Sequence, residues 1–169
     1  MCYTQSRFKA LLSACVMSLI ATAGWSQSLT WLGVLPNGTY SYAYDVSADG
    51  AVVVGWVYTA NLPLGRAFRW TAAGGMQDLG SLGGNRSYAY GVSADGAVVV
   101  GWAWNAAGYG RAFRWTASGG MQSLGTLPGG YWSAAYDVSA DGSVVVGWAE
   151  NAAGDWHAFR WTEIGRAHV

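Results

Sequence analysis

Apolar and polar residues alternate along most of this chain, with the period of two that is typical of β-strands. Aromatic and aliphatic side chains occupy every second position of residues 40–46, and the valine-rich run 51–56 follows. Between them lies Asp49-Gly50, a dipeptide favoured in hairpin turns because both residues tolerate positive φ. We therefore predict two antiparallel strands joined by a hairpin at Asp49-Gly50.

The same alternation predicts two further strands after this hairpin. Residues 67–71 form a third apolar segment, and residues 76–82 form a fourth after the turn Gly74-Gly75. Glycine-rich turns separate short segments of this kind in antiparallel sheets. The pattern therefore indicates four short antiparallel strands in about 46 residues.

The whole pattern then repeats along the chain. The segment VSADGAVVVGW at 46–56 returns almost unchanged at 92–102 and 138–148, and AFRWT follows each copy. Matching Leu-Gly pairs set the phase of a tandem repeat. The repeats span residues 29–75, 76–120 and 121–162, and residues 24–28 precede them.

Each unit has four predicted strands, and two of these strands end with a tryptophan. Near-identical units of this kind are typical of the blades of a β-propeller. We predict an all-β fold of tandem four-stranded antiparallel units, with three blades present. Propellers have about four to eight blades, so we expect an incomplete ring whose outer blades expose apolar faces and unpaired edges.

The first 23 residues have the pattern of a secretory signal peptide. Arg7 and Lys9 precede an apolar run at 10–23, which ends in Ala21-Thr22-Ala23. We expect an exported chain with no membrane span after this segment, because no later apolar run is long enough. A lipoprotein signal at Leu12-Ser13-Ala14-Cys15 is the alternative.

Composition excludes several classes of function for the mature chain. Both cysteines precede residue 24, so we expect no disulfide and no thiolate metal site. No motif indicates a cofactor, and we expect none. Residues 24–162 contain six arginines, no lysine and eight acidic residues, a balance of about minus two. The absence of a basic stripe argues against nucleic acid as a partner.

The last seven residues depart from the repeat. Repeats one and two continue after Trp-Thr into AAGGM and ASGGM, whereas repeat three continues into EIGRAHV at 163–169. This heptapeptide resembles the translation of a common sequencing adapter. We expect residues 163–169 to be an artefact and the remaining blades to belong to a longer protein.

Three motifs together resemble the bacterial HAF repeats, which occur in extracellular repeat proteins. They are HAFRW at 157–161, the DGxVVVGW segments and the link GGMQxLGxL, and the resemblance covers residues 32–162. Repeats one and two carry Arg66 and Arg111 in place of His157. The resemblance implies secretion or surface display and no established activity.

In a four-stranded meander the near-constant turns, 47–50 and 71–75 with their copies, share one end of each blade. The variable loops gather at the other end, where recognition usually resides. These loops are 36–39, 57–64, 83–86, 103–110, 128–132 and 149–155. Their side chains suited to stacking on a sugar or anchoring a protein are Tyr58, Asn61, Arg86, Trp104, Asn105, Tyr109, Tyr131, Trp132 and Trp156. The alternative is that these loops vary because nothing constrains them.

Candidate chemistry is sparse. The segment 45–50 has oxygens at alternate positions, as a calcium loop begins, but an Asp-Gly turn explains all three copies. The pair Glu150 and Asp155 has the residue types for glycoside hydrolysis, yet no other repeat contains it. We expect no metal and no catalytic residue, and we expect the repeated Arg69, Arg114 and Arg160 to pair with acids or cover aromatic rings.

These observations favour a secreted or surface-displayed, non-enzymatic module that binds a glycan or a protein through aromatic loops. Two alternatives remain open: a fragment of a glycan-processing propeller enzyme whose catalytic blades are missing, and a structural passenger or stalk segment.

Overall fold

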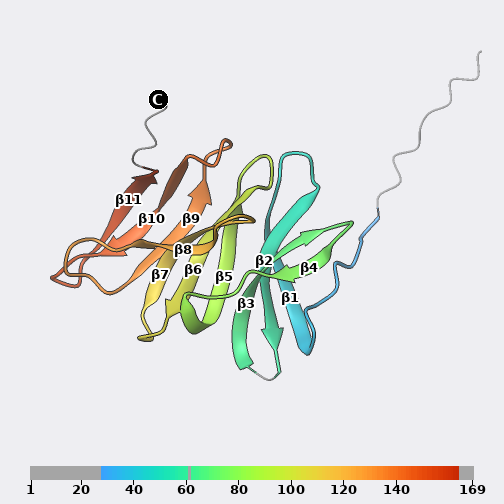
Figure 1. Cartoon of the computed structure of the whole chain (residues 1–169), viewed down its shortest axis with the longest axis horizontal. Helices are drawn as coiled ribbons and strands as arrows, with labels where there is room; N and C mark the ends of the chain where they lie inside the picture. The colour runs from blue at the N-terminus through green and yellow to red at the C-terminus, as the bar shows by residue number, and fades with distance from the viewer. Residues whose placement is uncertain (1–27, 61, 164–169) are drawn as a thin grey trace, which may run out of the picture. The chain divides into compact units, whose positions relative to one another are not determined.

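The strands of the chain form separate antiparallel sheets that follow one another in sequence order. The computed structural model (Figure 1) describes residues 28–60 and 62–163. The expected signal peptide, Asn61 and nearly all of the expected artefactual tail lie outside the described residues. Within the described residues, no helix has the length and apolar character to cross a membrane.

The first two sheets each contain four strands in meander order, as the alternation of apolar residues predicts. The first sheet consists of β1 (Gly38–Val46), β2 (Val52–Thr59), β3 (Leu62–Thr71) and β4 (Gly75–Asp78). The second consists of β5 (Gly83–Val92), β6 (Val98–Asn105), β7 (Gly110–Thr116) and β8 (Gly120–Gly125). The repeat boundaries 75/76 and 120/121 therefore pass through β4 and β8 instead of falling between sheets.

The third sheet has three strands among the described residues, and Figure 1 shows the second sheet between it and the first. Its strands are β9 (Ser133–Val138), β10 (Val144–Glu150) and β11 (Trp156–Thr162). The three sheets have the architecture of successive propeller blades, which confirms the predicted all-β fold. The sheets formed by residues 28–60 and 62–163 do not close into a ring.

A close approach of two strands explains the glycine of each VVVGW segment. At Gly101 a Cβ atom would lie 2.0 Å from the carbonyl oxygen of Tyr88 on the paired strand. The β5–β6 register shifts next to this contact, between Ala89 and Gly91, as at a β-bulge. Gly55 and Gly147 approach the carbonyl oxygens of Tyr42 and Ala134 equally closely. Any larger residue at these three glycines would therefore push the two paired strands apart.

The hairpin after each first strand is closed by its own side chains. The Ser47 hydroxyl donates to Asp49 Oδ1 at 2.6 Å, and the Ala51 N–H donates to the same oxygen at 2.9 Å. Gly50 has φ of 73°, whereas Asp49 does not have positive φ, so the turn is not of the doubly positive type. The carboxylate thus serves the turn itself, in agreement with the Asp-Gly interpretation and not with a calcium loop.

The apolar core lies between successive sheets. One cluster joins Val54 and Ala67 of the first sheet to Val92 and Phe113 of the second. A second cluster joins Val100 and other residues of the second sheet to the third. Burial of large apolar side chains between the sheets is the main force that holds neighbouring blades together.

Buried serines add polar bonds to these junctions. The Ser87 hydroxyl accepts from the Ala67 N–H at 3.0 Å and donates to the Gly80 carbonyl at 2.6 Å. Ser133, 46 residues later, repeats the arrangement with the Ala112 N–H and the Gly125 carbonyl. Because both serines are fully buried, their hydroxyls satisfy backbone groups that water does not reach.

Candidate functional site

In the first two sheets a tyrosine ring covers the tryptophan of VVVGW. Tyr42 lies opposite Trp56 in the β1–β2 ladder, and the two rings stack with centroids 4.7 Å apart. Tyr88 lies opposite Trp102 in the β5–β6 ladder at 5.3 Å. Such cross-strand aromatic pairs stabilise antiparallel sheets.

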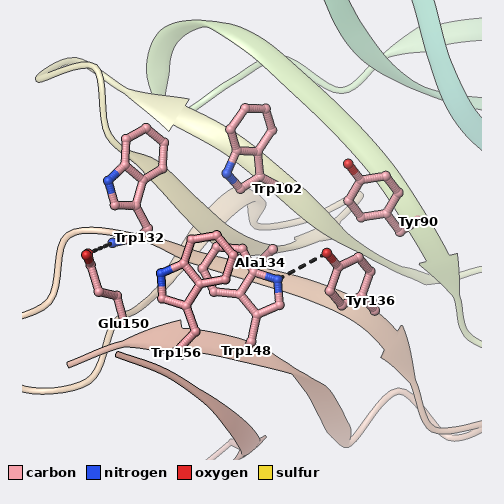
Figure 2. Close-up of a pocket in the computed structure, with 8 residues that line it drawn as sticks. All are labelled: Tyr90, Trp102, Trp132, Ala134, Tyr136, Trp148, Glu150 and Trp156. Carbon is pink, nitrogen blue, oxygen red and sulfur yellow. Dashed lines mark hydrogen bonds between the residues drawn. The ribbon is translucent and has the colours of Figure 1, made fainter. Parts of the chain in front are cut away.

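The third sheet lacks this ring, because Ala134 lies opposite Trp148. A pocket of about 460 Å³ opens at this place between the second and third sheets. Figure 2 shows Trp102 and Trp132 facing Trp148 and Trp156 across it. The lining residues are Tyr90, Trp102, Trp132, Ala134, Tyr136, Trp148, Glu150 and Trp156.

Trp156 forms part of the pocket wall by stacking on Trp148. The two rings are nearly parallel, with an interplanar angle of 7° and centroids 4.4 Å apart. Trp156 begins β11 opposite Glu150, a position held by Gly65 and Gly110 in the other sheets. The third repeat has therefore lost one aromatic ring and gained another beside the same tryptophan.

Trp132 is positioned by a carboxylate. Glu150 Oε2 accepts hydrogen bonds from the backbone N–H groups of Tyr131 at 2.8 Å and Trp132 at 3.0 Å. Charge-assisted bonds of this kind fix the backbone of the segment before β9. Tyr109 packs edge-on against Trp132 from the second sheet, with centroids 6.2 Å apart. The Trp132 ring is thus held by both sheets.

Two tyrosines close one end of the pocket. Tyr90 and Tyr136 stack with centroids 5.4 Å apart, and the Tyr136 hydroxyl accepts from Trp148 Nε1 at 3.1 Å. Burial, together with the neighbouring tyrosines, raises the pKa of Tyr90 to about 12. Its hydroxyl therefore stays protonated at neutral pH and is able to donate a hydrogen bond.

The pocket combines flat apolar walls with a few polar groups, as small-ligand sites do. The indole N–H groups of Trp102, Trp132 and Trp156, and Glu150 Oε1, have no hydrogen-bond partner among the described residues. No three His, Cys, Asp or Glu side chains of residues 28–60 and 62–163 lie close enough to hold a metal ion. The arrangement suits binding of a flat group that carries hydroxyls.

The structure brings four of the residues singled out in the sequence to this region. Trp132 and Trp156 line the pocket. Tyr109 and Tyr131 lie beside it, with their ring centroids 5.0 Å apart. These four residues come from the loop ends of the second and third sheets, where the variable loops were expected to gather.

The other residues from that prediction lie elsewhere. The Arg86 guanidinium sits over the Trp104 ring at 4.5 Å, and Asn105 Oδ1 caps its own loop by accepting from two backbone N–H groups. The ring of Tyr58 packs against that of Tyr40, with the two ring centroids 6.1 Å apart. Tyr58, Arg86, Trp104 and Asn105 belong to strands and not to loops, because β2, β5 and β6 extend further than their apolar patterns.

The arginine within AFRWT has a different partner from the one expected. Arg69 Nε donates to the Gly96 carbonyl of the next sheet at 3.1 Å, so it pairs with backbone and not with an acid. Arg114 Nε is buried without a hydrogen-bond partner among the described residues. Arg66, at the position of His157, forms an ion pair with Asp78 at 3.1 Å.

Sequence reasoning missed most of the pocket wall. Trp102 and Trp148 belong to the constant VVVGW segments, which the repeat identifies as scaffold, and Ala134 and Tyr136 belong to a strand. The available signal was the comparison of the repeats at a spacing of 46 residues, where Tyr42 and Tyr88 correspond to Ala134.

Comparison with known proteins supports the fold alone. No protein-family model and no curated protein matches the chain. The similar solved structures include a protein from Agrobacterium tumefaciens assigned as TolB, and TolB from Acinetobacter baumannii.

The similarity to these two proteins is structural and not close in sequence. The Agrobacterium protein is 16% identical with a TM-score of 0.56, over 79% of this chain and 47% of that one. The Acinetobacter protein is 13% identical with a TM-score of 0.56, over 78% of this chain and 31% of that one. The chain therefore spans about half the length of the first and about a third of the second.

Proposed function

We propose that this chain is an exported, non-enzymatic β-propeller module that binds a sugar ring of a glycan in the pocket between its second and third sheets. The observation that carries the proposal is Ala134, which stands where Tyr42 and Tyr88 cover a tryptophan. The pocket thus occupies the place that the six-membered ring of Tyr42 or Tyr88 fills in the first and second repeats.

The polar groups around the pocket favour a sugar over an aromatic side chain of a protein partner. Tryptophan faces accept the apolar C–H face of a pyranose, while indole N–H groups and a carboxylate pair with its hydroxyls. Glu150 Oε1, the Tyr136 hydroxyl and the Trp102 N–H supply such groups at the pocket wall. A purely aromatic ligand would leave Glu150 Oε1 and the Trp102 N–H without partners, which is unfavourable.

A binding role accounts for the single carboxylate of the pocket. Glu150 is held by two backbone N–H groups, and the pocket wall contains no second acid to act with it. Glycoside hydrolysis ordinarily needs two facing carboxyl groups. Export is supported by the pattern of residues 1–23 and by the resemblance of residues 32–162 to HAF repeats.

Binding to an array of hexose-containing oligosaccharides tests the proposal, with Ala134→Tyr as the decisive variant. The substitution places in the third sheet the residue that the other two already carry, so it should fold and fill the pocket. We expect it to weaken glycan binding by about tenfold or more. The matched control is Ala73→Tyr in the exposed β3–β4 turn at the other end of the first sheet.

The result that overturns the proposal is glycan binding that survives Ala134→Tyr, or no binding to any sugar on the array. Binding of N-acetyltyrosinamide in place of sugars would assign the pocket to an aromatic side chain of a protein.

A further inference from the structure

A second pair of aromatic rings lies beside the pocket, at the ends of two loops. Tyr109 and Tyr131 pack together with their ring centroids 5.0 Å apart, yet the two side chains remain 37% and 54% exposed. Tyr109 also forms an edge-to-face contact with Trp132, which lines the pocket, at a centroid distance of 6.2 Å. We call Tyr109 and Tyr131 the aromatic platform. Exposed aromatic surface that continues from a pocket is typical of an extended interaction site.

Hydrogen bonds within its own loop hold Tyr109 in place. Asn105 Oδ1 accepts from the backbone N–H groups of Ala107 at 3.0 Å and Tyr109 at 2.9 Å. The Asn105 N–H donates in turn to the Tyr109 carbonyl at 2.9 Å, which closes the loop. A ring that is fixed in this way loses little conformational entropy when a ligand stacks on it.

Tyr131 is fixed by the same carboxylate that serves the pocket. Glu150 Oε2 accepts from the backbone N–H groups of both Tyr131 and Trp132, at 2.8 Å and 3.0 Å. The Thr126 hydroxyl donates to the Gly130 carbonyl at 3.0 Å and so holds the residue before Tyr131. One carboxylate therefore sets the position of the platform relative to the pocket wall.

The junction between the first and second sheets has neither the platform nor the pocket. Leu64 and Asn85 occupy the positions that correspond to Tyr109 and Tyr131, so no aromatic pair forms there. At that junction the ring of Tyr88 also fills the place of the pocket. The two features thus occur together, at the junction of the second and third sheets, as expected for two parts of one site.

An arginine without an acidic partner lies beside the platform. In the first repeat Arg66 forms an ion pair with Asp78, but Ser123 holds the position of that aspartate in the second repeat. Arg111 accordingly forms no ion pair among the described residues, and its guanidinium lies over the Tyr109 ring, 5.6 Å from the centroid. Apart from one bond to a backbone carbonyl, its N–H groups have no partner in the described part of the chain. They suit the hydroxyls of a sugar.

From this arrangement we infer that the ligand is an oligosaccharide that binds with one sugar ring in the pocket and the neighbouring ring on the aromatic platform. The inference rests on the proposed function and extends it from a single sugar to a chain of at least two. Because Tyr109 touches the ring of Trp132, pocket and platform are contiguous, as two linked sugars require. The platform offers its rings to the apolar C–H face of the second sugar, while Arg111 donates to its hydroxyls.

NMR titration of the isotope-labelled chain tests the inference, with the best-binding hexose disaccharide of the array and with each of its constituent hexoses. We expect the disaccharide to bind about tenfold more tightly than either hexose, because a second ring is stacked. Tyr131→Ala should remove this gain and leave the affinity for the single hexose unchanged. Tyr131→Phe keeps the ring and should retain the gain.

Tyr40→Ala is the matched control, because Tyr40 is 62% exposed and packs against another tyrosine in the first sheet. It should change neither affinity, and circular dichroism checks the fold of every variant. Equal affinities for the disaccharide and a single hexose overturn the inference and leave the pocket as a site for one sugar. The inference is also overturned if Tyr131→Ala weakens the binding of both ligands alike. Absence of binding to any sugar overturns the proposed function itself, and the inference with it.

Discussion

Ala134 lies directly opposite Trp148 in the β9–β10 ladder, where the first two sheets place a tyrosine opposite a tryptophan. Because the ladder fixes the position of each side chain, loss of the tyrosine ring leaves an open space. Trp156, which replaces a glycine of the other repeats, then stacks on the uncovered tryptophan. Two replacements in one repeat thus turn a packed aromatic pair into a ligand-sized pocket.

The buried serine bridges should make a measurable contribution to stability. Ser87→Ala and Ser133→Ala each leave a buried N–H and a buried carbonyl without a partner, so we expect each to lower the free energy of unfolding by about 1–3 kcal/mol. Urea unfolding measures this quantity. Ser41→Ala is the matched control, because Ser41 has no preceding sheet to bridge among the described residues. Equal effects at Ser41 and Ser87 would contradict this account.

Making the repeats more alike should destabilise the protein at one position. Asp45 Oδ2 accepts from the Val92 N–H at 2.8 Å, which suggests aspartate as the better residue at the corresponding Gly91. However, a Cβ atom on Gly91 would lie 3.0 Å from the Tyr136 carbonyl oxygen and 3.2 Å from Asp137 Cα. Gly91→Asp should therefore lower the free energy of unfolding by about 1–3 kcal/mol through overpacking against β9.

The reciprocal change, Asp45→Gly, should also destabilise, because it removes the bond to Val92. The unfolding midpoints of both variants in urea check these predictions. A gain in stability from Gly91→Asp would show that β9 moves away easily and that the close contact has no structural role.

The hairpin aspartates should make stability dependent on acid pH. The hydrogen bond from Ser139, followed by those from Ser143, lowers the pKa of Asp141 to about 2, and Ser47 and Ser93 likewise lower the pKa of Asp49 and Asp95. Because the folded pKa lies below the unfolded value, this stabilisation is present above about pH 4 and is lost as the pH falls towards 2.

Thermal unfolding followed from about pH 5 down to about pH 2 measures this loss. The triple variant with asparagine at residues 49, 95 and 141 keeps an acceptor oxygen without a titrating charge, so its profile should be flatter. An identical profile for the unmodified chain and the triple variant would contradict a role of these carboxylates.

The blade architecture was accessible from the sequence because it depends on local patterns. The period of two predicts β1 and β2, the Asp-Gly and Gly-Gly turns predict the hairpins, and the repeat predicts that the arrangement recurs. Strand ends were harder to predict. β6 runs on to Asn105 because backbone pairing with β7 continues as far as Trp104, beyond the apolar pattern.

The pocket was less accessible, because it depends on which side chains meet across strands and sheets. Trp132 lies in a variable loop and Trp156 directly follows one at the start of β11, and these positions were sufficient to select them. Trp148 was not selected, because a residue constant among repeats suggests packing. Trp148 is exposed to the pocket because its cross-strand neighbour is the small residue Ala134. That pairing is known only from the register of β9 against β10.

The most direct test of the central claim is a titration of the isotope-labelled chain with the best-binding sugar, observed through the indole N–H signals of its tryptophans by NMR. The account predicts that the signals of Trp102, Trp132, Trp148 and Trp156 shift together and saturate, while those of Trp56 and Trp70 do not change. Ala134→Tyr should abolish these shifts. Saturable shifts at other tryptophans, with these four unaffected, would contradict the assignment of the pocket as the binding site.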